Sequence, residues 1–86
     1  MEQLEIIKSV NATLSENFEI PAHKLRGEAT LFDELEFDSL DAIDMMVYLE
    51  EKFQVQVPGE IFKEIKTLGD VYKLVGELTR TTKSQA

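Results

Sequence analysis

Apolar residues recur every three or four positions in several stretches of the chain, which is the spacing of one buried helical face. The first stretch predicts a helix over about residues 2–17, and another predicts a helix over about residues 39–52. The expected inward stripe of the first helix is Leu4, Ile7, Asn11, Leu14 and Phe18, widened by Ile6 and Val10, and that of the second is Ala42, Met46, Leu49 and Phe53, with Met45 at the edge.

Two more helices are expected in the last third of the chain. Pro58 fixes a helical first turn, so a short third helix is predicted from there to about Glu64. Thr67 and Asp70 have the spacing of a capping box and begin a fourth helix, which frays near Thr79. The inward residues of this last helix are Leu68, Val71, Tyr72, Val75 and Leu78.

A polar loop of roughly twenty residues joins the first two helices. Because so long a connection is unusual, we expect it to be ordered and anchored on the bundle by apolar side chains. The expected anchors are Ile20, Leu25, Leu31, Phe32 and Leu35. Residues 54–57 alternate like a strand, but a lone short strand has no partner. The sequence therefore predicts an all-α fold, a small four-helix bundle with three longer helices and one short helix.

Composition and charge narrow the possible functions. The 86 residues suffice for one small domain, expected over residues 1–80, with a polar and disordered tail over residues 81–86. A net charge of −8 argues against nucleic acid or an anionic membrane surface and favours partners with basic patches. The chain has no cysteine, no signal peptide and no apolar run of membrane-spanning length, so we expect a cytoplasmic monomer.

Ser39 lies where the long loop becomes the second helix, within Phe37-Asp38-Ser39-Leu40-Asp41. The first N–H groups of a helix lack intrahelical partners, so a serine there is either a cap or an attachment point for a phosphoryl group. Every charged residue between Gly27 and Glu51 is acidic. A free anion would be repelled, so a phosphate at Ser39 would have to be covalent. Both interpretations of Ser39 stay open here.

No catalytic or metal-binding pattern accompanies this serine. His23 is the single histidine, and without an assignable partner we expect a surface residue rather than a proton carrier. Calcium-loop frames that start at Asp33 or Asp38 place apolar residues at the third and fifth positions. The four glycines are scattered, so there is no phosphate-cradling loop. We therefore expect neither enzyme activity nor a bound metal.

The second helix also carries a mixed face. On the helical projection, three apolar residues interleave with three acidic ones. They are Leu40, Ile43 and Val47 with Asp44, Glu50 and Glu51. The arrangement is either a docking patch with an apolar centre and a charged rim, or a surface that the loop or the third helix covers.

From about Leu4 to Leu78 the sequence resembles the acyl carrier protein family. The resemblance lies in Asp38-Ser39-Leu40-Asp41, the acidic helix ending Leu49-Glu50-Glu51-Lys52-Phe53, and the following Val57-Pro58. It implies that Ser39 carries a 4′-phosphopantetheine arm, transferred from coenzyme A by a phosphopantetheinyl transferase. The thiol of the arm would hold acyl groups as thioesters and present them to acyl-transferring and ketosynthase-type enzymes of fatty-acid or polyketide synthesis. The carrier itself would perform no chemistry.

The resemblance implies two further sets of residues. The partner-binding residues would be Asp38, Leu40, Asp41, Ile43, Asp44, Val47, Glu50 and Glu51. An acyl-chain cavity would be lined by Met46, Leu49, Phe53, Ile65, Leu68 and Tyr72.

Three residues depart from the pattern of housekeeping fatty-acid carriers. Glu36-Phe37 stands where those carriers usually have glycine and a small residue, and Tyr48 stands where a small residue is common. Two alternatives stay open: a dedicated carrier of a secondary-metabolite pathway, with aryl, peptidyl or D-alanyl cargo, and an unmodified acidic adaptor in which Ser39 is only a cap.

Overall fold

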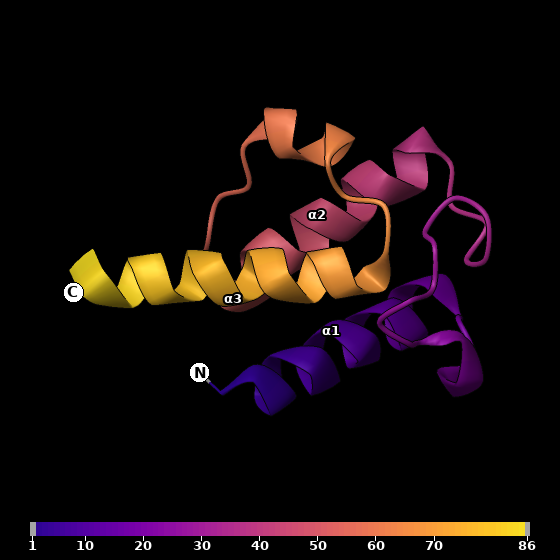
Figure 1. The fold of residues 1–86 in the computed structure, drawn as a ribbon, viewed down its shortest axis with the longest axis horizontal. Helices are drawn as coiled ribbons and strands as arrows, with labels where there is room; N and C mark the ends of the chain where they lie inside the picture. Colours follow the sequence, from indigo (N-terminus) through magenta and orange to yellow (C-terminus); the bar gives the residue numbers. More distant parts are fainter. Residues whose placement is uncertain (1, 86) are drawn as a thin grey trace.

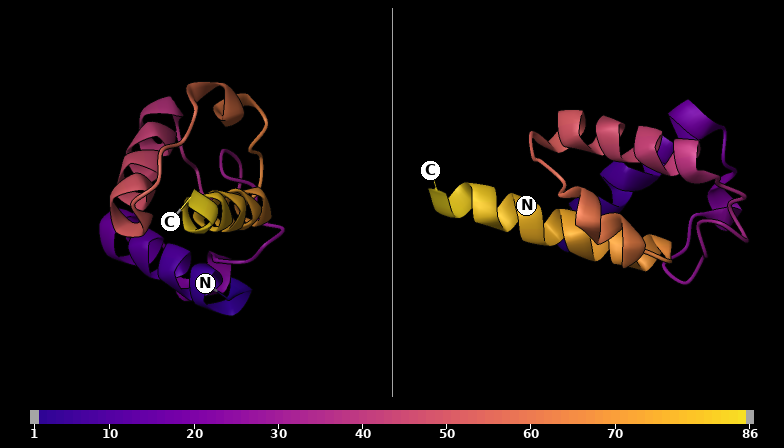
Figure 2. Two further views of the ribbon diagram at one scale, coloured as in Figure 1. Left: turned by 90° about the vertical axis from the view of Figure 1, so that its left-hand side faces the viewer. Right: turned by 90° about the horizontal axis from the view of Figure 1, so that it is seen from above.

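Three α-helices and two short 3₁₀-helices form the fold in the computed structural model, which describes residues 2–85. In chain order they are α1 (Gln3–Phe18), η1 (Ala22–Lys24), α2 (Ser39–Phe53), η2 (Gly59–Lys63) and α3 (Leu68–Gln85). Each α-helix packs against the other two, and the long loop closes one end of the bundle (Figure 1). The C-terminal part of α3 extends past the other elements (Figure 2).

The all-α prediction is confirmed, but the count of four helices is not. The ends of α1 and α2 lie within one residue of their predicted positions. The predicted third helix is the 3₁₀-helix η2, because its hydrogen bonds span three residues rather than four. Ile61 N donates to Pro58 O at 3.1 Å, and Glu64 N donates to Ile61 O at 2.9 Å. Sequence analysis missed η1 entirely.

The start of α3 confirms the predicted capping box. Asp70 Oδ2 accepts the backbone N–H of Thr67 at 3.1 Å, and Thr67 Oγ1 accepts that of Asp70 at 3.3 Å. The same carboxylate accepts the N–H of Lys66 at 2.9 Å. These hydrogen bonds, with that from Lys66 foremost, lower the pKa of Asp70.

The predicted end of the last helix near Thr79 is wrong, because α3 continues to Gln85. Thr79 sits inside the helix, where its hydroxyl donates to Val75 O at 2.9 Å. The division of the chain into a domain over residues 1–80 and a tail over residues 81–86 stays a prediction.

One apolar core lies between the three α-helices. The predicted inward residues of α3 are buried, except Leu78, which is half-buried. Two helical predictions need correction: Leu4 is exposed, and Met45 is fully buried rather than at the edge of its stripe. The centre of the buried stripe of α1 runs through Ile6, Val10 and Leu14, so Leu4 lies outside it.

The loop before α2 is anchored as expected, although Phe32 is not one of its anchors. Ile20, Leu31 and Leu35 are buried and Leu25 is partly buried, whereas half of Phe32 is exposed. The apolar character of Phe32 could not show whether a core lies beneath this part of the loop. The sequence alone therefore did not show that Phe32 is half exposed.

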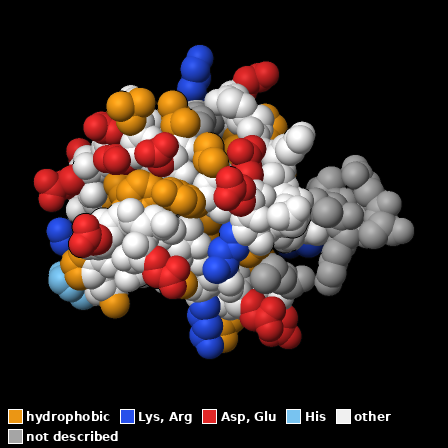
Figure 3. All heavy atoms as spheres, turned by 180° about the vertical axis from the view of Figure 1, so that it is seen from behind, with side chains coloured by type: hydrophobic (Ala, Val, Ile, Leu, Met, Phe, Trp, Pro, Cys, Tyr) orange, Lys and Arg blue, Asp and Glu red, His pale blue; other side chains and the backbone are white. Residues whose placement is uncertain are grey.

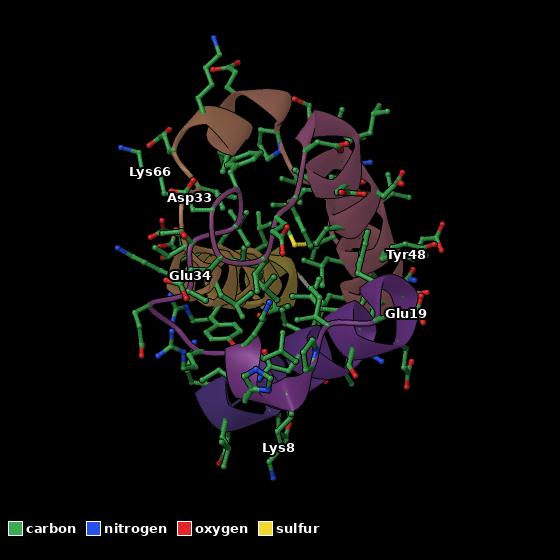
Figure 4. The ribbon with its side chains drawn as sticks, turned by 90° about the vertical axis from the view of Figure 1, so that its right-hand side faces the viewer. Lys8, Glu19, Asp33, Glu34, Tyr48 and Lys66 are labelled. Carbon is green, nitrogen blue, oxygen red and sulfur yellow. The ribbon has the colours of Figure 1, made fainter. Side chains whose placement is uncertain are left out.

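Backbone atoms hold the loop against the start of α3. Leu31 N donates to Lys66 O at 3.0 Å, and Leu68 N donates to Ala29 O at 2.9 Å. Gly69 N donates to the carbonyl oxygen of Gly27 at 2.7 Å, and a Cβ at Gly69 would lie 2.9 Å from that oxygen. Figure 4 shows Lys66 on the same side of the molecule as loop residues Asp33 and Glu34.

Candidate functional site

Ser39 is the first residue of α2, and its neighbour Asp38 is the N-cap. Asp38 Oδ1 accepts the backbone N–H of Asp41 at 2.9 Å, and Asp41 Oδ2 accepts that of Asp38 at 3.3 Å. The interpretation of Ser39 as the cap is therefore wrong, because Asp38 satisfies the helix start. The side chain of Ser39 is exposed and makes no hydrogen bond to any described residue. Its hydroxyl is free to react.

Three aromatic rings fix the segment that leads into Ser39. Phe37 is buried, and its ring centroid lies 5.1 Å from that of Phe18 at the end of α1. On the other side, Phe18 meets Tyr48 of α2 edge-on at 5.8 Å. Phe37 and Tyr48 thus contact the same ring, that of Phe18, and connect the loop, α1 and α2. Both residues depart from the pattern of housekeeping fatty-acid carriers. Figure 4 shows Tyr48 beside Glu19, where α1 ends.

Glu36 has a left-handed backbone conformation, with φ at 57°. This turn lets the next residue, Phe37, donate its backbone N–H to Leu31 O at 2.9 Å. Glycine adopts positive φ without steric cost, whereas glutamate does not. Residue 36 is thus a position where the backbone conformation favours glycine, and it is also where housekeeping fatty-acid carriers usually have glycine.

A hollow of about 230 Å³ opens beside Ser39. It lies between the loop, the first turns of α2 and η2, and its lining is mainly apolar. Phe32, Ser39, Ala42, Ile43 and Lys63 line it. An attached group can therefore rest against apolar surface next to the hydroxyl.

The mixed face of α2 is open to solvent. Leu40, Ile43 and Val47 are 71%, 48% and 44% exposed, so neither the loop nor η2 covers them. Asp44 and Glu51 are exposed as well, and carboxylates surround apolar side chains on this side of the molecule (Figure 3).

Three of the predicted partner-binding carboxylates also have structural roles. Asp38 and Asp41 form the cap of α2, and Glu50 Oε2 accepts the backbone N–H of Val57 at 2.7 Å. Arg26 precedes the acidic segment between Gly27 and Glu51. It forms ion pairs with Glu28 at 3.4 Å and Glu34 at 2.9 Å, which partly offset the negative charge of that segment.

The six residues expected to line an acyl-chain cavity belong to the core or pack against it. Met46, Leu49 and Leu68 are buried, as are Ile65 and Tyr72, and Phe53 is half-buried. The Tyr72 hydroxyl donates to Asn11 Oδ1 of α1, and burial raises the pKa of this phenol.

Sequence reasoning missed two residues beside Ser39. The sequence predicts Phe32 as an anchor of the loop. It predicts a helix around Lys63 but does not show which side of that helix faces the rest of the fold. No pattern in the sequence shows which side of η2 faces α2, so only the fold brings Lys63 to the hollow. His23 is exposed, as expected. Among the described residues there is no group of three potential metal ligands, and none of their helices is long and apolar enough to span a membrane.

Comparison with known proteins gives a consistent result. Residues 8–75 match the family model described as the phosphopantetheine attachment site. The chain is 37% identical over 78 residues to acyl carrier protein 2 of Ralstonia nicotianae, covering 91% of this chain and 96% of that protein. It is 33% identical over 75 residues to the acyl carrier protein of Thermosynechococcus vestitus, covering 87% and 93%. The crystal structure of the acyl carrier protein of Thermotoga maritima superimposes with a TM-score of 0.82 at 27% identity, covering 95% of each chain.

Proposed function

Since the chain belongs to the acyl carrier protein family, we propose that Ser39 is the residue that bears its arm. Members of the family are carriers and not enzymes, and their prosthetic group is covalently bound 4′-phosphopantetheine. The observation that supports Ser39 is its exposed hydroxyl, which no described residue engages. Asp38 caps α2 in its place, so modification leaves the helix start intact.

Attachment needs only one reactive atom from this chain. Ser39 Oγ forms a bond to the phosphorus of coenzyme A that carries the pantetheine, and the pyrophosphate bond on the other side of that phosphorus breaks. Adenosine 3′,5′-bisphosphate leaves, and a base of the transferase takes the hydroxyl proton. Once bound, the arm supplies the thiol that holds acyl groups as thioesters. This chain has no cysteine, so that thiol is its only one.

The mixed face of α2 is the proposed docking surface for the transferase and for acyl-transferring and ketosynthase-type enzymes. Its exposed apolar centre provides contact area, and the surrounding carboxylates attract basic patches. Asp44 and Glu51 are the main charged residues of this surface, because their carboxylates make no hydrogen bond or ion pair with a described residue. Leu40, Ile43 and Val47 form its centre.

The proposed space for a bound acyl chain is the core between α2, η2 and α3. Its side chains pack on one another, so an acyl chain has to separate them as it enters. Met46 is the candidate to move, since its unbranched and flexible side chain adapts more readily than a fixed ring. Tyr72 stays attached to α1 through Asn11. A monomeric state and a cytoplasmic location remain predictions.

Intact-mass measurement tests the attachment site. The purified chain is incubated with coenzyme A and a broad-specificity phosphopantetheinyl transferase, and the added groups are counted. We expect one phosphopantetheine on the wild-type chain and none on Ser39→Ala. The matched control Ser15→Ala, which removes an exposed hydroxyl from α1, accepts one group.

Ser39→Ala leaves the fold intact, with a stability change within about 0.5 kcal/mol, because Ser39 is exposed and is not the cap. A folded Ser39→Ala variant that still accepts the arm, or an arm mapped to another residue, contradicts the assignment.

A further inference from the structure

Among the described residues that line the hollow beside Ser39, one has a charged side chain. Lys63 reaches the hollow from η2, on the opposite side from the first turn of α2. The other described lining residues are Ser39 and the apolar Phe32, Ala42 and Ile43. A cation and a modifiable hydroxyl thus share one small, otherwise apolar concavity.

Lys63 is the cation available to this site. Every charged residue from Gly27 to Glu51 is acidic, so the part of the loop after Arg26 and most of α2 offer no positive group. Arg26 is engaged with Glu28 and Glu34. Lys63 is exposed and makes no ion pair with any described residue. Its ammonium can therefore turn toward a new anion.

Attachment of the arm creates such an anion. The link between Ser39 and pantetheine is a phosphodiester, which carries one negative charge at neutral pH. That charge lies close in the sequence to Glu36, Asp38 and Asp41, whose carboxylates repel it. A lysine is a compact, flexible partner for phosphate oxygens.

We propose that Lys63 pairs with the phosphodiester on Ser39 and holds the base of the arm against the hollow. Phe32 and Ile43 then contact the branched apolar part of pantetheine next to the phosphate. The pairing gives the arm a preferred starting direction across the gap between α2 and η2. This inference rests on the proposed attachment at Ser39. Lys63 is a positioning residue and takes no part in forming or breaking bonds.

NMR spectroscopy of the unloaded and loaded chain tests the pairing directly. On loading, the side-chain signals of Lys63 shift, whereas those of Lys66, which does not line the hollow, stay in place. In the loaded Lys63→Gln variant, the ³¹P signal moves and narrows relative to the wild-type chain, because the phosphodiester loses its partner and gains mobility. The matched variant Lys66→Gln, with the same change in charge, keeps the wild-type signal. Salt shifts the wild-type signal toward that of Lys63→Gln.

Two results overturn the proposal: Lys63 signals that do not respond to loading, or a ³¹P signal that is the same in Lys63→Gln and the wild-type chain. Lys63→Arg keeps the charge and is expected to retain the wild-type signal. If Lys63→Gln fails to fold, the response of Lys63 to loading of the wild-type chain decides the question. Failure of the wild-type chain to accept the arm at Ser39 is a different outcome, which contradicts the proposed function instead.

Discussion

Replacing Glu36 with glycine is expected to stabilise the protein. Glu36 has φ at 57°, a conformation that costs a residue with a Cβ roughly 1–2 kcal/mol. Glycine removes this cost but adds entropy to the unfolded chain, worth about 0.4–1 kcal/mol. The net expected gain is about 0.5–1 kcal/mol, or a rise in Tm of roughly 2–8 °C for a domain of this size.

The prediction needs a control for charge. Glu36 lies in an acidic segment, so removing its carboxylate relieves repulsion whatever happens to the backbone. Glu36→Ala removes the same charge but keeps a Cβ at positive φ. The difference between Glu36→Gly and Glu36→Ala therefore isolates the backbone cost. Glu19→Gly, at a second left-handed position with φ at 54°, is expected to give a gain of similar size.

Thermal and urea unfolding followed by circular dichroism give the two free energies, at low and at moderate salt. The gain of Glu36→Gly over Glu36→Ala is expected to be independent of salt, since it is steric, whereas the gain of either variant over the wild-type chain shrinks as salt rises. If Glu36→Gly is no more stable than Glu36→Ala, the cost of the left-handed backbone at this position does not exceed the entropy that glycine adds to the unfolded chain, and the reasoning is refuted.

Three further predictions follow from the docking face, the cap of α3 and the loop contact. Reversing both Asp44 and Glu51 to lysine is expected to slow association with the transferase about tenfold at low salt and much less at high salt, as measured by stopped-flow fluorescence. If reversing two exposed glutamates of α1 slows association equally, the effect belongs to net charge and not to the docking surface. Because backbone hydrogen bonds lower its pKa, Asp70 stabilises the fold above the pKa of the unfolded carboxyl group, and this contribution is lost as pH falls through the folded-state pKa. Asp70→Asn is therefore expected to cost about 0.5–1 kcal/mol at neutral pH and progressively less in acid, by urea unfolding across pH, and a constant difference would contradict the role of the charge. Gly69→Ala places a Cβ 2.9 Å from the carbonyl oxygen of Gly27 and is expected to lower stability by about 1–3 kcal/mol; a variant with unchanged stability would show that the loop moves aside freely.

Helical periodicity predicted the parts of the fold that depend on burial along one face. The inward residues of α3 and the extent of α2 followed from spacing alone, because a helix repeats its contacts every turn. Periodicity could not separate α-helix from 3₁₀-helix in η2, since five residues span too few turns to define a period. It also could not place the end of α3, because the polar sequence after Leu78 has no apolar period from which to predict a helix.

The sequence names candidate site residues but does not give the geometry in which they lie. The sequence left open whether Ser39 is a cap or an attachment point, and the hydrogen bonds of the structure assign the cap to Asp38 instead. The left-handed turn at Glu36 gave no signal, because glutamate is not a residue that marks positive φ. Lys63 comes to Ser39 only through tertiary packing of η2, which no local pattern encodes.

The way the loop is held has a consequence for how such a protein diverges. Its connections to the start of α3 use peptide N–H and carbonyl groups, which almost every residue type supplies, together with close contact at Gly69. Side chains at the exposed loop positions 32 and 33 are therefore under little demand from folding. Substitutions can accumulate there and reshape the approach to the attachment serine, while the fold that presents it is inherited unchanged.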